Sequence, residues 1–226
     1  MPVADQIRVK KRVLEILNLA DAGTYSVTLS PRNKTHNTLA VDDAILDAGL
    51  AVLKTIAESP ASEYRRALIS VVAVNHGEQL PEHIGKVAFV QIQAFDGASY
   101  RRAEQRPLAR IEAYRENTLS IYDAIDHNQD GSTLGGYYDI WENKIYFTGF
   151  AASVGIASVA RADVATKMPE VLEHTQIGLA VENCVKAGEG NVTMEVARWH
   201  GDRARQTLAE IKGEKRPPYR LSLIHI

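Results

Sequence analysis

Residues Tyr137–Thr148 read YYDIWENKIYFT, which places two runs of aromatic and β-branched residues on either side of Glu142-Asn143. Such runs favour β-strands, and a two-residue loop joins them into a hairpin. In this register four cross-strand pairs form: Ile140 with Ile145, Tyr138 with Phe147, Asp139 with Tyr146, and Trp141 with Lys144. The first two pairs share one face of the hairpin and the last two share the other. The segment therefore predicts an aromatic hairpin with two usable faces, which is what a docking surface needs.

Extended segments surround this hairpin in the middle of the chain. Leu68–Val74 is a β-branched run, Lys86–Gln93 alternates apolar and polar residues, and Ala152–Ala160 is again extended. The stretch between the first two segments is rich in turn formers, so we predict a pair of strands joined by a long loop. A short helix is predicted over Arg106–Asn117.

Helical patterns precede the β region. Apolar residues at helical spacing predict a first helix over about Asp5–Ala20. Asp42 and Asp43 suit the N-terminus of a second helix, where carboxylates meet the positive end of the helix dipole. Ser59-Pro60 ends that helix.

Two further helices are predicted near the C-terminus. Gly188-Glu189-Gly190 breaks the helical pattern, Asn191 can cap the helix that follows, and Gly213 lies just beyond its end. Because the connection is short, the two helices should pack antiparallel as an αα-hairpin.

Together these patterns predict an α+β fold that is mainly helical, with N-terminal helices, an inserted β region, a C-terminal αα-hairpin and an extended tail. We expect one domain over residues 5–212, with a β-rich insertion over about 67–160, and a tail over 213–226. Pro217-Pro218 stops the last helix from continuing into the tail. The apolar ending Leu221–Ile226 either docks on a neighbour or is not native to the protein, so little depends on it.

The composition bears on several classes of protein. The 226 residues, 45% of them hydrophobic, can bury a core of their own, and the formal net charge is −2. A dedicated nucleic-acid binder would usually carry a clear excess of basic residues, so the near-neutral charge of this chain argues against that class. The single cysteine, Cys184, cannot form an internal disulfide, which fits a reducing compartment. We find neither an apolar run long enough for a bilayer nor a signal-peptide pattern, so we expect no membrane partner.

One segment matches the start of a calcium loop. Asp126, Asn128 and Asp130 carry oxygen side chains at alternate positions, and Gly131 follows where the loop turns sharply. The match then fails, because Tyr137 occupies the position of the bidentate Glu and a hairpin follows in place of a helix. A structural turn is the favoured interpretation, and a bound cation is the alternative.

The sequence shows no catalytic or cofactor pattern. Its seven histidines are scattered without the close spacing of a zinc site, and Cys184 lies on an apolar helical stripe, as a small hydrophobe would. There is no nucleophile elbow and no phosphate-cradling glycine loop. We therefore predict a protein without catalytic residues or a cofactor. A metal-dependent enzyme built on Asp126, Asp130 and a histidine is the least favoured alternative.

Two basic segments are candidate contact surfaces. Trp199 shares a helix with Arg198, Arg203 and Arg205, a combination that supplies much of the binding energy of protein interfaces. Stacking of Trp199 in the core fits the pattern equally well. The Arg8–Arg12 cluster fits the solvated face of an amphipathic helix, and the alternative is contact with nucleic acid or with an acidic neighbour. A cytoplasmic interaction or nucleic-acid-binding regulator is therefore the main alternative function.

The order of the predicted pieces is itself informative. Four features can be compared with those of known families. They are Asp42-Asp43-Ala44-Ile45 opening a long helix, His76–Pro81 followed by His83-Ile84-Gly85, the Tyr137–Thr148 hairpin, and the closing pattern from Met168 to Ile211. With these features in this order the chain resembles, over roughly Ile7–Lys212, the head-to-tail adaptor (connector) proteins of short-tailed bacteriophages. The long β portion departs from the most compact helical adaptors.

The resemblance implies a non-enzymatic virion protein at the head–tail junction, assembled in the host cytoplasm. Its partners would be the portal protein, met by the C-terminal segment, and a nozzle or tail-tube protein, met by the hairpin. Copies would form a ring of about twelve subunits. DNA would pass through this ring without sequence-specific binding, and a near-neutral chain suits such a conduit. The residues expected to dock on partners are Tyr138, Trp141, Tyr146, Phe147, Trp199, Tyr219 and Leu221.

Overall fold

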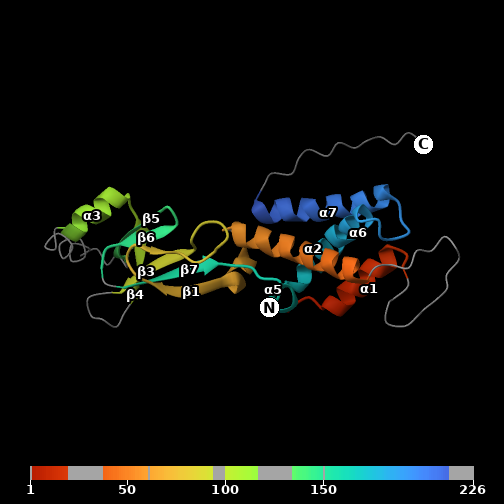
Figure 1. Ribbon diagram of the computed structural model, residues 1–226, viewed down its shortest axis with the longest axis horizontal. Helices are drawn as coiled ribbons and strands as arrows, with labels where there is room; N and C mark the ends of the chain where they lie inside the picture. Colours follow the sequence, from red (N-terminus) through yellow and green to blue (C-terminus); the bar gives the residue numbers. More distant parts are fainter. Residues whose placement is uncertain are drawn as a thin grey trace. The chain divides into compact units, whose positions relative to one another are not determined.

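The chain, drawn in Figure 1, divides into two units. Each unit has a hydrophobic core of its own. The computed structural model describes residues 2–19, 38–60, 62–93, 100–116, 134–149 and 151–213. One unit joins Met1–Ala67 to Val159–Ile226, and the other is Leu68–Ser158. These boundaries fall beside the limits of 67–160 expected for the insertion. The two ends of the inserted unit lie side by side, because Ile69 pairs with Ala157.

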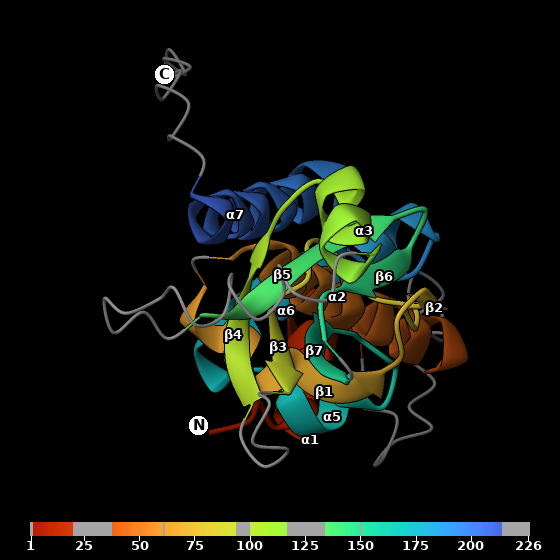
Figure 2. The same ribbon diagram turned by 90° about the vertical axis from the view of Figure 1, so that its left-hand side faces the viewer.

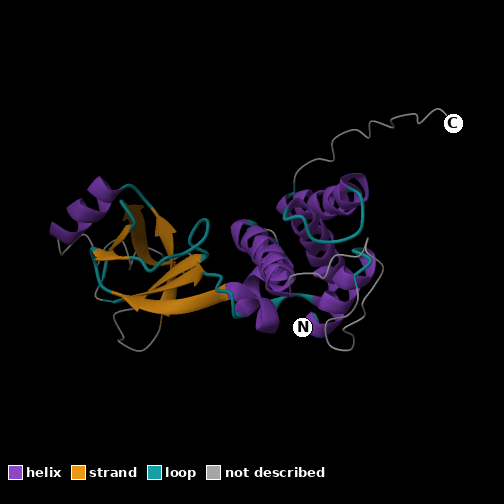
Figure 3. Cartoon of the chain, turned by 45° about the vertical axis from the view of Figure 1, so that its right-hand side comes forward, coloured by secondary structure: helices purple, strands orange, loops and turns teal. Residues whose placement is uncertain are grey.

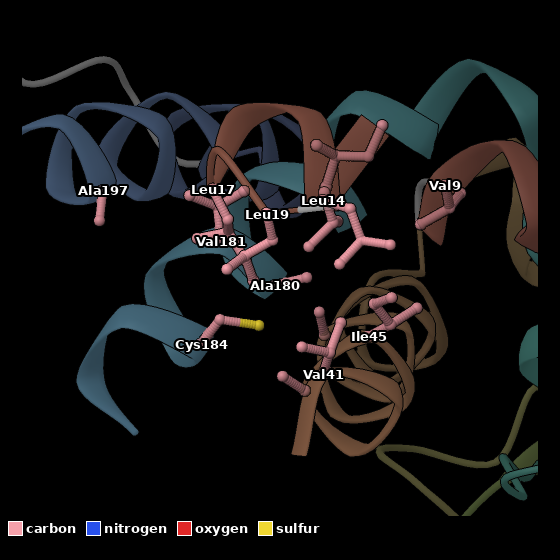
Figure 4. Close-up of a cluster of buried hydrophobic side chains, with 14 residues drawn as sticks. Val9, Leu14, Leu17, Leu19, Val41, Ile45, Ala180, Val181, Cys184 and Ala197 are labelled. Atoms are coloured by element: carbon pink, nitrogen blue, oxygen red, sulfur yellow. The ribbon is translucent and has the colours of Figure 1, made fainter. Parts of the chain in front are cut away.

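Helices from both ends of the chain build the first unit, which we call the helical unit (Figure 3). Its longest helices are α1 (Gln6–Ile16), α2 (Thr38–Glu58), α6 (Glu173–Lys186) and α7 (Met194–Lys212). Shorter helices are η1 (Glu63–Leu68), which leads into the other unit, α5 (Asp163–Lys167) and η2 (Glu170–Leu172). The longest helices each contribute buried side chains to one core, drawn in Figure 4, where Cys184 is directed inward as the sequence predicted.

The N-terminal helices differ from their predicted limits. Helix α1 ends at Ile16, and Asn18 follows in the left-handed region at a φ of 53°. Helix α2 begins at Thr38, so Asp42 and Asp43 lie inside it rather than at its N-terminus. Their carboxylates are paired there with Lys10 and Arg161, respectively. The acidic pair therefore reflects contacts of the helix surface, not a helix start.

Helices α6 and α7 run in opposite directions and pack together, which confirms the predicted αα-hairpin (Figure 1). Small residues allow the close approach: a Cβ at Gly178 would lie 2.6 Å from the His200 carbonyl oxygen. The predicted cap of α7 is wrong, because the Thr193 side chain accepts the hydrogen bond from the Val196 N–H. Asn191 instead donates to the carbonyl of Asn18.

The described residues of the second unit, which we call the sheet unit, form a seven-stranded sheet and one helix. The strands are β1 (Ile69–Val74), β2 (Glu78–Gln79), β3 (Phe89–Gln93), β4 (Tyr100–Gln105), β5 (Leu134–Trp141), β6 (Lys144–Phe147) and β7 (Ala152–Ala157), and the helix is α3 (Leu108–Glu116). Their order is β1-β7-β3-β4-β5-β6-β2, and Figure 2 looks onto β4, β3 and β7 side by side. Only the β4–β5 pair is parallel.

This sheet corrects the predicted fold class: the protein is a mixed α/β protein with a sizeable sheet, not a mainly helical one. Strand β4 was missed because it shows no apolar alternation: Arg101 and Arg102 are exposed and Ala103 is its one buried residue. The two predicted strands over Leu68–Val74 and Lys86–Gln93 both form, but they do not pair. Strand β7 lies between them, which only the long-range strand order reveals.

The aromatic hairpin has the predicted register. Strands β5 and β6 pair through the same four residue pairs that the sequence gives when Glu142-Asn143 is the loop. Glu142 and Asn143 have φ values of 49° and 59°, so the loop has two consecutive left-handed residues, as a type I′ turn requires. The twist of this turn matches that of the strands and fixes which side chains face the core.

Candidate docking surfaces

The hairpin separates its aromatic residues into two groups. Phe147 is fully buried and Tyr138 packs against the same core, so Phe147 stabilises the sheet unit and is not accessible to a partner. Burial raises the pKa of the Tyr138 phenol above its ordinary value. On the opposite face Tyr146 is half-buried, and Trp141 is 58% exposed beside the turn. The aromatic residues of the hairpin that lie on the face opposite this core are therefore Trp141 and Tyr146.

Neighbouring segments hold the hairpin in place. The Asn143 side-chain amide donates to the Leu80 carbonyl at 3.0 Å, and the Leu80 N–H donates back to the Asn143 carbonyl at 2.8 Å. The His76 ring meets Tyr146 edge to face at a centroid distance of 5.5 Å. Both contacts come from the segment beside β6, so the turn next to Trp141 is held by neighbouring residues, and a held side chain loses less entropy if it is bound.

Asp139 connects the hairpin to α3, which sequence reasoning missed. Its carboxylate accepts hydrogen bonds from the Leu108 N–H at 2.8 Å and from the Gln105 side chain at 3.2 Å. Leu108 is the first residue of α3, so the carboxylate satisfies a free N–H at the helix N-terminus. The sequence signal for this contact is an aspartate within an aromatic strand, although an aspartate at such a position can also face water.

The helical unit carries a second aromatic surface, which we call the Trp199 groove. The groove has a volume of about 470 Å³, and its lining includes Ile16, Val171, His174, Ile177, Trp199 and Arg203. Trp199 is 59% exposed, so the alternative that it stacks in the core is wrong. The Arg203 guanidinium lies over the indole ring with its Cζ 5.9 Å from the centroid, and it forms no ion pair within the described residues. A groove that combines apolar side chains with a tryptophan and an arginine suits an apolar partner side chain flanked by a carboxylate.

His200 adds a polar group to the Trp199 groove. Its ring meets the Trp199 ring edge to face at 4.8 Å. Burial and, to a lesser degree, the charge of Arg203 lower the pKa of His200 below its ordinary value. The imidazole is therefore neutral near pH 7, where it can both donate and accept hydrogen bonds.

The basic N-terminal cluster is neutralised by acidic neighbours. The Arg8 guanidinium donates to both carboxylate oxygens of Glu173 and to Glu170 at 2.8 Å, and these hydrogen bonds raise its pKa above the usual range. Lys10 pairs with Asp42, and Arg12 with Glu15. An adjoining cavity of about 490 Å³ contains Arg8 together with Glu170 and Glu173. A phosphate backbone would have to displace these carboxylates.

Several predicted site residues lie outside the described residues: Asp126, Asn128, Asp130, Tyr219 and Leu221. In the part of the chain that the structure describes, no group of three His, Cys, Asp or Glu side chains is placed to hold a metal ion. His76 and His83, which flank one loop, do not come together: His76 contacts β6, and His83 bonds the Pro81 carbonyl. No helix among the described segments is long and apolar enough to cross a membrane.

Comparisons with protein-family models and with curated proteins find no match to this chain.

Proposed function

We propose that the protein is a structural connector of a tailed-bacteriophage virion that joins the portal to the tail. One observation carries the proposal: the chain has two tryptophans, and each unit leaves one of them more than half exposed. Trp141 lies in the sheet unit and Trp199 in the helical unit. Two anchoring surfaces on two units, each with its own core, suit a protein that binds a different partner with each unit.

The energy available at each surface supports this function. Burying the exposed part of a tryptophan ring contributes about 3 kcal/mol, before any aromatic or cation–π contact is added. Exposed tryptophans with neighbouring arginine are frequent hot spots of protein interfaces. The proposed arrangement is that the hairpin, through Trp141 and Tyr146, meets a nozzle or tail-tube protein. The helical unit, through the Trp199 groove and the C-terminal segment, meets the portal protein.

A ring of copies completes the proposal. Identical subunits form a closed ring through heterologous contacts, in which two different surfaces of each copy meet. A formal net charge of −2 suits a conduit, because a strongly basic lumen would retain DNA through its phosphates. No catalytic step, cofactor or metal is part of this function, and the site of action is the head–tail junction of the virion.

The regulator alternative has less support. Its two basic surfaces are Arg8–Arg12, where three of the cations are paired with carboxylates, and the Trp199–Arg205 part of α7, where Arg205 pairs with Glu182 and Asp202. Arg198 and Arg203 form no ion pair among the described residues, and Arg203 lies over Trp199. Two such arginines on one helix are a weak basis for a phosphate track.

The proposal is tested by variants that each weaken binding to one of the two partners. The full chain, with Trp141→Ala or Trp199→Ala, is incubated with the portal protein and with the tail protein encoded beside it, and each complex is quantified. We expect Trp141→Ala to weaken tail binding and Trp199→Ala to weaken portal binding, each by about tenfold to a hundredfold. The matched controls are Tyr100→Ala and Val196→Ala, which remove residues 42% and 43% exposed in the same two units. Equal binding by all four variants would exclude these surfaces.

A further inference from the structure

Strand β1 forms one edge of the sheet, and half of the N–H and C=O groups of β1 point away from the rest of the sheet. Among the described strands its one neighbour is β7, paired in the register that places Val71 opposite Gly155. The carbonyls of Gly155 and Ala157 accept hydrogen bonds on the opposite side of β7, from Ala88 and Ile84. The even-numbered residues of β7 therefore bond to β1, and the even-numbered residues of β1 bond back.

The odd-numbered residues of β1 are consequently turned outward. The N–H and C=O groups of Ile69, Val71 and Ala73 point to the open side of the sheet, and no hydrogen bond joins them to any described residue. Unpaired backbone groups along an edge form a template for another strand. The edge is six residues long, which is enough for a specific strand pairing.

The β1 edge lacks the usual protection against pairing. Its sequence is ISVVAV, without charge, proline or glycine. Val71 is 61% exposed, and its side chain shares a face with the adjacent Gly155 and Phe89. Natural sheets guard free edges with lysine, proline or bulges, because an apolar uncharged edge associates with other strands. The composition of this edge therefore favours pairing with another strand.

The opposite edge of the sheet is closed. The segment Asn75–Leu80 covers β6, with the Gly77 N–H donating to Ile145 at 2.7 Å and the Leu80 N–H to Asn143 at 2.8 Å. The outermost strand there, β2, has two residues and includes Glu78. If copies joined head to tail, β1 of one copy would have to pair with the β2 edge of the next. That edge is short and carries Glu78, so such a chain of sheets does not form.

We infer that β1 pairs with β1 of a second copy of this chain, antiparallel and about a two-fold axis. With Val71 opposite Val71, Ile69 lies opposite Ala73, and every outward N–H meets an outward C=O of the other strand. The axis is perpendicular to the sheet, so the apolar strips of Ile69, Val71 and Ala73 from the two copies join on one face. No charges are brought together, since the strand has none.

This contact goes beyond the proposed function. A two-fold contact closes with two copies, whereas a ring uses heterologous contacts, so the pair is a form of the free protein before assembly. Pairing covers the β1 edge, which would otherwise stay open to strands of other proteins, while the protein accumulates. The contact would have to be released or replaced when a ring forms.

Thiol cross-linking of the full chain tests both the partner and the register. Val71→Cys places two thiols on directly opposed residues, whose Cα atoms are about 5.5 Å apart in such a pair. Ala73→Cys is the matched control, because the two copies of residue 73 would lie about 14 Å apart along the strands. The native thiol contributes little background, since Cys184 is buried and burial raises its pKa to about 11. We expect a short thiol cross-linker to yield covalent dimers of Val71→Cys and few of Ala73→Cys.

Solution mass provides the second measurement. We expect the wild-type chain to dimerise with increasing concentration and Val71→Lys to remain monomeric and folded by circular dichroism. Ile7→Lys is the control, since that isoleucine is 82% exposed but lies on α1 of the helical unit. A wild-type monomer at every concentration, a dimer lost through Ile7→Lys alone, open-ended growth, or equal cross-linking at 71 and 73 would overturn the inference.

Discussion

Glu182 on α6 accepts a hydrogen bond of 2.6 Å from Arg205 on α7, with its own side chain only 5% exposed. Lys186 contacts the other carboxylate oxygen at 2.8 Å. A buried carboxylate is tolerated only when it is paired, so this contact fixes the rotation of the two helices against each other. Since Trp199 lies on α7, the same contact fixes the position of the Trp199 groove.

Stability should depend on this carboxylate in acid. Burial alone would raise the pKa of Glu182, but the hydrogen bonds from Arg205 and Lys186 outweigh it and hold the pKa below its ordinary value. The pair therefore stabilises the fold fully above the pKa of an unfolded glutamate, and this contribution is lost as pH falls through the lowered folded value. We expect Glu182→Gln to lower the free energy of unfolding by about 2 kcal/mol at pH 7. Its stability should also fall less steeply in acid.

Denaturant unfolding of wild type and Glu182→Gln, followed by circular dichroism from neutral pH into acid, measures both effects. Glu195→Gln is the control, because Glu195 is exposed in the first turn of α7. If the free energy of unfolding fell equally steeply with decreasing pH in wild type and in Glu182→Gln, the proposed contribution of Glu182 would be wrong.

Gly201 should be intolerant of alanine for the same reason. A Cβ at this position would overlap the Glu182 carboxylate and push it off Arg205. Although alanine favours a helix interior over glycine by about 1 kcal/mol, we expect Gly201→Ala to destabilise the protein. In a Glu182→Ala background the overlap disappears, so the same substitution should become neutral or stabilising. A double-mutant cycle of unfolding free energies measures this coupling, and additive effects would contradict it.

The hairpin turn offers a stabilising change. Glu142 has a left-handed backbone, which costs a non-glycine residue about 1 kcal/mol and costs asparagine less. We expect Glu142→Asn to raise the free energy of unfolding of the sheet unit by about 0.5 kcal/mol and Glu142→Val to lower it. Hydrogen exchange of β5 and β6 reports on this unit alone. Identical protection in both variants would mean that the turn is not strained.

Cys184 should be inert in the folded protein. Burial, followed by the charge of Glu189, raises the pKa of the thiol to about 11, so little thiolate exists at pH 8. A disulfide exchange reagent should react slowly with the native chain and rapidly after denaturation. Fast labelling of the folded protein would place Cys184 outside the core.

Features of the fold that depend on residues close in sequence were predicted better than features that depend on residues far apart in sequence. The register of β5 and β6 follows from a two-residue loop and strict alternation, both visible between Tyr138 and Phe147. The same alternation puts Phe147 on the core face with Ile145, which is why its predicted docking role does not fit its burial. Strand order depends on contacts distant in sequence, so neither β7 between β1 and β3 nor the open β1 edge could be predicted.

The exposure of Trp199 could have been predicted. Ala197, Gly201 and Ala204 recur every three to four residues and form the buried face of α7. Trp199 lies off that stripe, so the small residues, rather than the tryptophan, mark where α7 packs. Asp139 and Arg101 were harder to interpret, because a charged residue in a strand can cap a helix or face water, and only the tertiary neighbours decide.

The central claim is best tested by mixing the purified protein with the portal protein encoded in the same genome and examining the product by size exclusion and electron microscopy. The connector function predicts a co-migrating complex in which a ring of this protein caps one end of the portal ring, with the ring lost or weakened in Trp199→Ala. Two folded proteins that elute separately, with no ring on the portal, would contradict it.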